Sequence, residues 1–544
     1  MGLIAGIVSR DRSDISDFLY RMAVKLRHRG NSSFCVCKKG GNGWEPVICE
    51  NSEEILTLQM PFGIVGRHFI IDKNNETIPY TDCLNKRVLL LDGRFFNISE
   101  LAHELQSNHK GNFVNSSIML HIIEELGKKF FNFSEIFGKI FDLIEGMFAG
   151  TLILKENVFI FRDLIGIKPL YLYSGPKYIA FASEKKALWA AGLTQRIEPL
   201  RPGRVMRVAE KGFTSHFQAE FTQKGMATKQ LEYYSKMLLQ RLKQTLVKLK
   251  PGNPFYLLLS GGIDSTLLAI LLKKLDLRFN SLVIGTEKSK DIQAAEKAAN
   301  FLGQPLEILK FDVPTLEETL PLLIYHVESR DEKKLNIAFP LFHASNYLHK
   351  KNCSVIFTGQ GADELFGGYE RHEIQFQEDP DKLQDLLWDD VRNLYLGNLQ
   401  RDDGASMANT VELRLPYLTR KLIELAMQIP PSLKIQTPIR KYILRHIGKQ
   451  IGLSEAIVQQ PKRAIQFSSG SYDTLKKLAK QFGFSKDFVL KSGFFSPTQL
   501  FIDSFAYRLG FPNIDPKVIK FVEQTKIDWP DSILKHENLV NTII

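Results

Sequence analysis

Long hydrophobic runs are absent from the 544-residue sequence. Its longer apolar stretches, at 256–259 and 267–272, fall far short of the roughly 20 residues that a membrane-spanning helix requires. We therefore expect no transmembrane helix and no membrane partner. The apolar stretch at 1–7 is too short for a secretory signal peptide, so we expect a cytoplasmic protein.

Cysteine is scarce as well. The five residues form an odd number without any C-x-x-C spacing: Cys35, Cys37, Cys49, Cys83 and Cys353. Cys35 and Cys37 would lie on one face of a strand, which is a poor arrangement for tetrahedral zinc. We expect reduced thiols, with neither a disulfide framework nor a zinc site.

A concentrated basic segment is also missing. The sequence has 71 Lys and Arg against 60 Asp and Glu, a net charge of +11 and a pI near 9.1. This excess is compatible with a nucleic-acid partner, with a basic cleft for a polyphosphate, or simply with the general charge of a basic proteome. Because the basic residues are scattered, we do not expect a nucleic-acid partner.

What remains is the composition of a globular protein, with 44% hydrophobic and 24% charged residues. Residues 1–210 alternate between short apolar segments and polar turns, which is typical of strands. We expect strands at 3–9, 62–71, 87–92, 148–154, 158–162, 171–173 and 178–182, and helices at 13–28 and 116–128. This pattern predicts an α+β domain with layered, mainly antiparallel sheets.

The pattern changes after a polar stretch at 222–229. A helix at 230–248 is followed by alternating elements, with strands at 255–259, 280–285, 306–311 and 354–358 and helices at 265–275, 292–302, 316–328 and 340–350. This alternation predicts an α/β domain with a parallel sheet over 225–470, mostly helical from 382 onward. Residues 471–544 form a helical extension whose role the sequence does not indicate.

The segment L-L-L-S-G-G-I-D-S-T at 257–266 predicts a buried strand, a Gly-rich turn and a helix. Backbone N–H groups of such a turn form a cradle for an anion, and Gly261 and Gly262 let a phosphate approach the backbone. Ser260 and Ser265 add hydroxyl groups. Asp264 is expected beside a phosphate only if a cation such as Mg²⁺ bridges them. The Walker motif is absent.

A second strand runs into a Gly-rich loop at 355–369, V-I-F-T-G-Q-G-A-D-E-L-F-G-G-Y. Such a loop can approach ATP closely and present Asp363 to a metal ion.

These two segments carry a family resemblance. The first resembles the pyrophosphate-binding loop of ATP pyrophosphatases, and the second resembles the asparagine synthetase block S-G-E-G-[AS]-D-E-x-F-G-G-Y. The stretch 406–418, Lys441 and Lys462 match later family motifs, so the resemblance covers about 250–470. It implies that Asp264 and Asp363 hold Mg²⁺ and that Lys462 contacts the phosphates of ATP. The remaining implied ATP-binding residues are Leu259, Ser260, Gly261, Gly262, Ser265, Ile284, Thr358 and Gly359.

The first domain resembles the glutaminase domain of the same family, which is of the N-terminal-nucleophile type. The family's nucleophilic Cys is replaced by Gly2, and glycine has no nucleophile. The family's N-G-E motif reads Asp92-Gly93-Arg94, and Asn115 replaces a later Asp. Asp92 would repel an oxyanion and Arg94 an ammonium group. Arg67 still matches the arginine that binds the glutamine carboxylate, and we expect an inactive glutaminase.

One departure concerns the synthetase site. Gln360 stands where the family has a Glu needed to form the acyl-adenylate, and glutamine cannot take a proton. Glu328 or Asp331 could supply the acidic group instead, or the substrate could differ from aspartate.

The resemblance implies an ATP-dependent ligase that converts aspartate and ammonia to asparagine, with AMP and pyrophosphate as the other products. Three alternatives stay open: a β-lactam-synthetase-like cyclase or other adenylating ligase, a non-catalytic ATP-binding regulator, and an RNA-modifying pyrophosphatase. ATP and Mg²⁺ are the expected cofactors, small molecules the expected partners, and a homodimer is compatible with the sequence.

Overall fold

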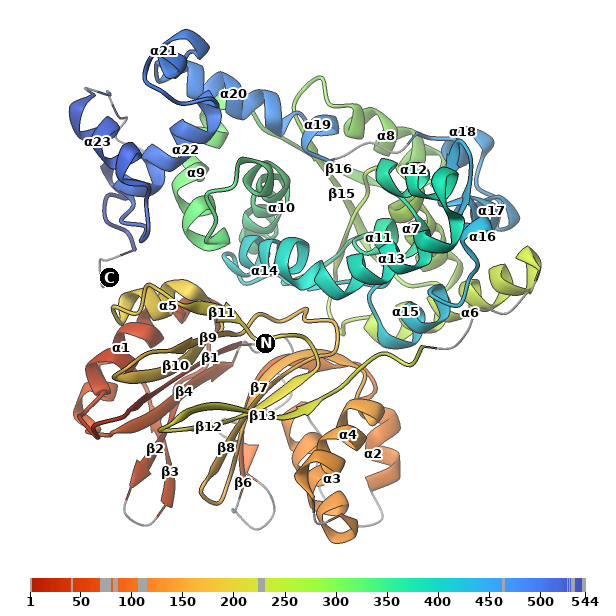
Figure 1. Ribbon diagram of the computed structural model, residues 1–544. Coiled ribbons are helices and arrows are strands. Elements are labelled where there is room, and N and C mark those ends of the chain that lie inside the picture. Colours follow the sequence, from red (N-terminus) through yellow and green to blue (C-terminus); the bar gives the residue numbers. More distant parts are fainter. Residues whose placement is uncertain are drawn as a thin grey trace.

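The computed structural model describes residues 2–40, 43–68, 80–81, 87–105, 115–130, 132–223, 230–461, 465–525, 527, 529 and 534–540. Figure 1 shows a strand-rich N-terminal part below a largely helical part. No helix in the described ranges has the length and apolar character to cross a membrane.

Two antiparallel sheets form the N-terminal part. One has the strand order β11-β9-β10-β1-β4-β2-β3 and the other β13-β12-β8-β7-β6-β5. Apolar side chains of β1, β2, β4 and β10 pack against those of β6, β7 and β8, so the sheets lie face to face. The strands are β1 (Gly2–Ser9), β2 (Phe34–Gly40), β3 (Gly43–Cys49), β4 (Phe62–His68), β5 (Tyr80–Thr81), β6 (Arg87–Phe95), β7 (Gly146–Leu154), β8 (Asn157–Arg162), β9 (Tyr171–Ser174), β10 (Tyr178–Ala182), β11 (Ile197–Pro199), β12 (Arg204–Ala209) and β13 (Gly212–Gln218).

Helices cover the outer faces of both sheets. Figure 1 shows α1 and α5 beside the first sheet and the helices α2, α3 and α4 beside the second, each group with its own apolar cluster. Their bounds are α1 (Ser16–Lys25), α2 (Ile98–Leu105), α3 (Asn115–Lys129), α4 (Phe133–Leu143) and α5 (Lys185–Ala190). The α+β prediction with layered antiparallel sheets is confirmed, but the sequence did not predict β2, β3, β5, β11, β12 and β13.

The second part is built on a parallel sheet with the order β16-β15-β14-β17-β18. Its strands are β14 (Tyr256–Leu258), β15 (Asn280–Gly285), β16 (Leu306–Lys310), β17 (Val355–Phe357) and β18 (Glu412–Arg414). The helices up to β18 are α6 (Leu231–Leu249), α7 (Ile263–Lys274), α8 (Lys290–Leu302), α9 (Val313–Val327), α10 (Glu332–Lys350), α11 (Ala362–Phe366), α12 (Glu370–Glu378), α13 (Pro380–Leu394), the π-helix Tyr395–Leu399 and α14 (Gln400–Met407). The predicted parallel sheet is confirmed.

The chain after β18 is helical apart from a two-residue hairpin, β19 (Ile435–Gln436) and β20 (Ile439–Arg440). The C-terminal helices share one continuous apolar core with the parallel sheet, through side chains such as Leu475 and Phe501. Lys25 of α1 also donates to the carbonyl oxygen of Leu539 at 2.7 Å. These helices are α15 (Arg420–Ala426), α16 (Pro431–Lys434), α17 (Tyr442–Gln450), α18 (Glu455–Val458), α19 (Ile465–Ser468), α20 (Ser471–Gln481), α21 (Lys486–Lys491), α22 (Pro497–Arg508) and α23 (Pro516–Gln524).

Candidate active site

The turn between β14 and α7 has the geometry of an anion cradle. Gly261 has φ +74°, and an added Cβ there would overlap the backbone of Ala294 in α8, so glycine is required. The Oγ atoms of Ser260 and Ser265 lie 3.2 Å apart beside this turn. A small cavity of about 60 Å³ opens between the turn and the N-terminus of α7, whose N–H groups favour negative charge.

Three basic side chains line the same small cavity: Lys290, Lys441 and Arg445. Lys290 begins α8, and Arg445 is held on α17 by bonds to the carbonyl oxygens of Arg440 and Gln460 at 2.7 and 3.1 Å. Neither Lys290 nor Arg445 is predicted as a site residue by the sequence. Basic side chains around an N–H cradle suit a polyphosphate.

The two carboxylates expected to hold a metal ion lie together. Asp264 is in the first turn of α7 and Asp363 in α11, directly after the neighbouring strands β14 and β17. The Nζ atom of Lys441 lies 2.5 Å from Asp264 and 2.7 Å from Asp363, and its side chain is 1% exposed. The two loops touch, because an added Cβ on Gly359 would lie 3.0 Å from the Cβ of Asp264.

This arrangement fits a Mg²⁺ ion that is shared with a substrate. Oδ1 of Asp264 is buried and has no hydrogen-bond partner within the described residues, so it can accept a cation. The described ranges contain no group of three or more His, Cys, Asp or Glu that could hold a metal ion. Because Mg²⁺ usually binds through one or two carboxylates plus substrate phosphates, Asp264 and Asp363 suit it only together with a nucleotide.

Glu364 is a buried carboxyl group that the sequence analysis overlooked. It is 2% exposed and accepts bonds from the Tyr369 hydroxyl at 2.6 Å and from Asn398 Nδ2 at 2.8 Å. Burial, followed by the nearby charge of Asp363, raises the pKa of Glu364 to about 7. Its position directly after Asp363, the carboxylate expected to hold a metal ion, would have been the signal.

Replacing Glu364 should therefore alter the pH dependence of stability. Native Glu364 retains its proton between its ordinary pKa of 4.5 and about 7, so its share of the unfolding free energy falls as pH rises through that window. Glu364→Gln keeps an acceptor for Tyr369 and Asn398 but cannot ionise. We expect the variant to be more stable than wild type at pH 8, by up to about 3 kcal/mol, with a much smaller difference at pH 4.5.

Urea unfolding at the two pH values measures this difference. Glu378→Gln, at the end of α12, replaces an exposed carboxylate and should leave stability unchanged at both pH values. An equal effect of Glu364→Gln at pH 4.5 and pH 8 would contradict the assigned titration.

The acids proposed to compensate for Gln360 have other partners in the structure. Gln360 itself follows β17, and its backbone N–H donates to Thr358 Oγ1 at 3.4 Å. Glu328 accepts from the backbone N–H groups of Lys185 and Lys186 at 2.9 and 2.6 Å, so it holds the start of α5. Asp331 caps α10 by accepting from the N–H of Lys334. Glu328 is thus engaged in the contact between the two parts, which argues against an acidic role beside Gln360.

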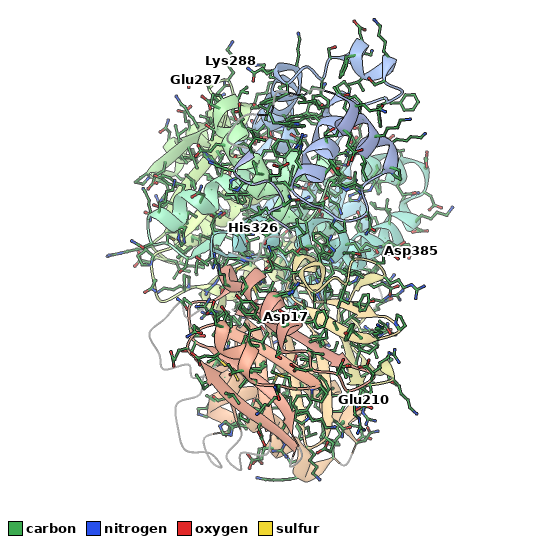
Figure 2. The ribbon with its side chains drawn as sticks, turned by 90° about the vertical axis from the view of Figure 1, so that its left-hand side faces the viewer. Asp17, Glu210, Glu287, Lys288, His326 and Asp385 are labelled. Atoms are coloured by element: carbon green, nitrogen blue, oxygen red, sulfur yellow. The ribbon has the colours of Figure 1, made fainter. Side chains whose placement is uncertain are left out.

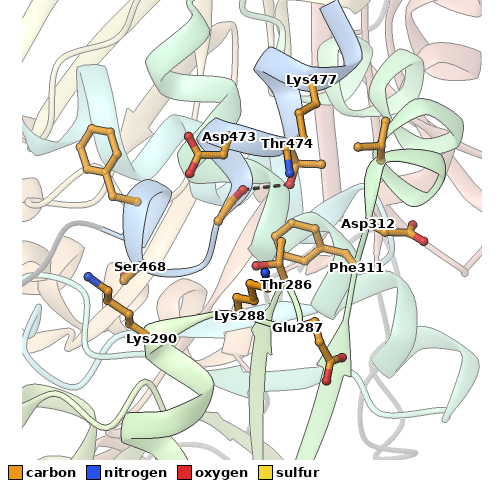
Figure 3. A pocket seen from close by; sticks show the side chains of 13 residues that line it. Thr286, Glu287, Lys288, Lys290, Phe311, Asp312, Ser468, Asp473, Thr474 and Lys477 are labelled. Carbon is orange, nitrogen blue, oxygen red and sulfur yellow. Dashed lines mark hydrogen bonds between the residues drawn. The ribbon is translucent and has the colours of Figure 1, made fainter. Parts of the chain in front are cut away.

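The predicted adenosine residues lie at the ends of adjacent strands. Leu259 follows β14 and Ile284 is in β15, and both side chains are buried. A cavity of about 750 Å³ opens beyond β15. Lys290 lines both this cavity and the small cavity at the turn between β14 and α7, which we call the phosphate turn. Figure 3 shows that α20 forms one wall through Asp473, Thr474 and Lys477, so the C-terminal helices contribute to a cavity beside the site.

Gly2 leaves no space for a side chain at the position of the missing nucleophile. It lies in β1 opposite β4, and an added Cβ would overlap the carbonyl oxygen of Arg67. The Gly2 N–H donates to Asp92 at 2.9 Å, which occupies the position expected for an oxyanion-hole amide.

Asp92 belongs to a buried ionic cluster that joins the two parts. Arg29 is fully buried and forms ion pairs of 2.8 Å with Asp92, Glu184 and Asp403. Asp403 comes from α14 of the helical part and also pairs with Lys168 at 2.8 Å. These cations keep the pKa of Asp403 below its ordinary value despite burial. Figure 2 places His326 at the same junction, where its ring packs edge-on against His28.

The other residues of the expected glutamine site have different partners. Arg67 donates to the backbone carbonyl oxygens of Ser32 and Arg27 at 2.5 and 3.0 Å. Arg94 lies 3.4 Å from Glu412 of the helical part, and with Arg414 it holds the pKa of Glu412 down to about 2. Gly93 has φ +155° and packs against β7. Asn115 begins α3, and its side chain is outside the described part of the structure, as is the whole of Lys462.

The fold and the site define a class: a parallel-sheet domain with a phosphate turn and paired carboxylates, joined to a layered antiparallel domain. The profile of the family described as asparagine synthase matches residues 238–381 and 375–500, and that of the glutamine amidotransferase domain matches 66–190. The chain belongs to the asparagine synthetase family.

Relatives match over most of the chain. A protein of Methanocaldococcus jannaschii that carries the name asparagine synthetase [glutamine-hydrolyzing] 1 is 29% identical, with 89% of this chain and 96% of the relative covered. Asparagine synthetase [glutamine-hydrolyzing] 2 of Oryza sativa subsp. japonica is 27% identical, with coverages of 92% and 83%. Among solved structures, a glutamine phosphoribosylpyrophosphate amidotransferase from B. subtilis covers 57% of this chain and 65% of its own, at 16% identity and a TM-score of 0.35, too weak a likeness to bear on function.

Proposed function

We propose that the chain is an ATP-dependent amide ligase that uses free ammonia. The observation that carries this proposal is the pair Asp264 and Asp363, which converge on Lys441 beside the anion cradle at 260–265. In the reaction a substrate carboxylate attacks the α-phosphate of ATP, which forms an acyl-adenylate and releases pyrophosphate. Ammonia then attacks the acyl carbon and displaces AMP.

The chain's own residues supply positioning and charge. The turn 260–265 would hold the departing pyrophosphate, with Lys290 and Arg445 offsetting its negative charge. Leu259, Ile284, Thr358 and Gly359 would form the nucleoside site, and Lys462 would contact the phosphates. A Mg²⁺ ion held by Asp264 and Asp363 would neutralise phosphate charge during adenylation. Lys441 separates the two carboxylates and reduces their mutual repulsion.

Aspartate is the substrate we propose, because the relatives that match this chain are named as asparagine synthetases. The experiment is a pyrophosphate-release screen of the full chain with ATP, Mg²⁺, ammonium chloride and each of the common amino acids. Release driven by aspartate, together with asparagine detected by mass spectrometry, is the expected result. Release driven by another acid would exclude aspartate but keep the ligase class, whereas no release with any acid would favour an ATP-binding regulator.

Gln360 provides a sharper test of the substrate. If aspartate is adenylated by the family mechanism, Gln360→Glu restores an acidic group in the loop that carries Asp363, and asparagine formation should rise severalfold. Gln360→Asn keeps the amide and is the matched control, with no increase expected. If the chain acts on another carboxylate, the added charge beside the ATP phosphates should leave the rate unchanged or lower it.

A further inference from the structure

A second cleft lies between the two parts of the molecule, away from the phosphate turn. It has a volume of about 730 Å³, within the range of small-molecule sites, and domain junctions are common places for such sites. One side is formed by the chain around β12 and β13 and the other by α13 and the π-helix Tyr395–Leu399. None of the residues proposed above to bind ATP lines it.

The cleft carries positive charge with little to balance it. Arg201, Arg204 and Arg392 line it, and Glu220 is the acidic member of its lining. Within the described residues, Arg201 and Arg204 have no carboxylate within 4.0 Å, whereas Arg392 lies 3.3 Å from Asp389. The Nε atom of Arg204 is buried and has no hydrogen-bond partner in the same ranges. Buried polar atoms are rarely left unpaired, so this group is suited to an anionic partner.

The opposite wall, from α13 and the π-helix, is mainly apolar. Trp388, Val391, Tyr395 and Leu396 line it together with Arg392, and Leu396 is 41% exposed. Arg201 and Arg204 on one side and a mainly apolar wall on the other suit a ligand that has both an anionic group and an apolar body.

We propose that this cleft binds a small organic anion of nucleotide size and that its occupancy regulates the ATP site. The phosphate or carboxylate group of this ligand contacts Arg201 and Arg204, and its ring, the apolar body, contacts the wall formed by α13 and the π-helix. The ligand does not take part in the ligase reaction, so its binding stands apart from the proposed function, whereas the regulatory role rests on the ATP site of that function.

The π-helix connects the cleft to the Gly-rich loop that carries Asp363 and Glu364. Tyr395 and Leu396 line the cleft, while Asn398 in the same five residues donates to Glu364 at 2.8 Å. Glu364 directly follows Asp363, which pairs with Lys441. Short π-helical segments are rare and occur frequently at functional sites. A ligand that favours one position of this segment therefore changes the affinity for ATP, and ATP changes the affinity for the ligand by the same factor.

The binding experiment uses 1-anilinonaphthalene-8-sulfonate, an aromatic anion, as a fluorescent probe of the full chain, with uridine 5′-monophosphate as competitor. We expect the two to compete, and the double variant Arg201→Gln/Arg204→Gln to weaken both at least tenfold. Arg207→Gln, an exposed arginine of β12 outside the cleft, is the matched control and should change neither affinity. Equal affinities in the double variant and wild type would overturn the site. Competition by inorganic phosphate as strong as that by the nucleotide would overturn the role of the apolar wall.

The coupling experiment repeats the probe titration with and without saturating Mg²⁺ and ATP, after ATP binding has been measured separately. We expect ATP to change the probe's affinity at least threefold in wild type, and Asn398→Ala to remove that change while the probe's affinity without ATP stays within twofold. An unchanged affinity in wild type that binds ATP would overturn the regulatory role. Failure to bind ATP at all would instead contradict the proposed function, and the arginine variants would still test the cleft.

Discussion

Asp264→Asn should lower the rate of pyrophosphate release by about 100-fold or more while the fold is retained. In the proposed function Asp264 supplies one of two carboxylates for the metal ion, and its Oδ1 atom has no hydrogen-bond partner within the described residues. Asparagine keeps the size of the side chain but removes the charge that a Mg²⁺ ion and the phosphates require. The measurement is pyrophosphate release with ATP, aspartate and ammonium, together with circular dichroism to confirm folding.

The matched control is Asp385→Asn. Asp385 is an exposed carboxylate of α13, labelled in Figure 2, and its replacement should leave the rate within twofold of wild type. Asp363→Asn should resemble Asp264→Asn, since both carboxylates contact Lys441. A rate for Asp264→Asn close to wild type would mean that the turn after β14 is only structural, and the proposed function would fail.

The second large effect concerns the nitrogen source. Ammonium salts should support amide formation, whereas glutamine should give none, with glutamate release no higher than that of heat-treated protein. Gly2 provides no nucleophile, and Asp92 is held by Arg29 and by the Gly2 N–H instead of facing an oxyanion. Glutamine-dependent glutamate release by the wild-type chain would refute the prediction that the N-terminal part has no glutaminase activity.

Gly2→Cys should not restore glutaminase activity. An added Cβ overlaps the Arg67 carbonyl oxygen, so β1 and β4 must shift, at a cost of about 1–3 kcal/mol in the free energy of unfolding. Gly127→Cys is the matched control because it adds the same thiol in α3, where the space is open and the residue exposed. Thermal unfolding compares the two variants, and a Gly2→Cys protein as stable as Gly127→Cys would contradict the packing argument.

Local sequence patterns predicted the elements that position the site. The alternation of apolar segments and helices from 255 onward gave the parallel sheet, because each buried strand reads as a continuous apolar run. The missed strands have a different character: β2 ends in Lys38, Lys39 and Gly40, and β3 contains Pro46, so neither shows a simple apolar alternation. β2 pairs with β3 and with β4, and the periodicity of a sequence does not reveal which strands pair.

The same contrast between local sequence pattern and long-range packing applies to the residues of the site. Asp264 and Asp363 could be named because each lies in the first helical turn after a strand and its Gly-rich loop, and neighbouring parallel strands end at the same edge of the sheet. Lys290 and Arg445 reach the phosphate turn from α8 and α17, so only tertiary packing identifies them. The same holds for Arg29, whose three carboxylate partners lie at 92, 184 and 403.

The cluster around Arg29 makes the helical part dependent on the N-terminal part. Asp403 and Glu328, both buried in the helical part, have their partners in the N-terminal part. Asp403 pairs with Arg29 and Lys168, and Glu328 lies 3.9 Å from Lys186 Nζ and accepts from the backbone N–H groups of Lys185 and Lys186. A chain that discarded the N-terminal part would lose these contacts and open a surface that is now buried to water. The helical part thus depends on the N-terminal part for the neutralisation of its buried acids, whatever that part catalyses, and we expect deletion of residues 1–218 to yield an insoluble product.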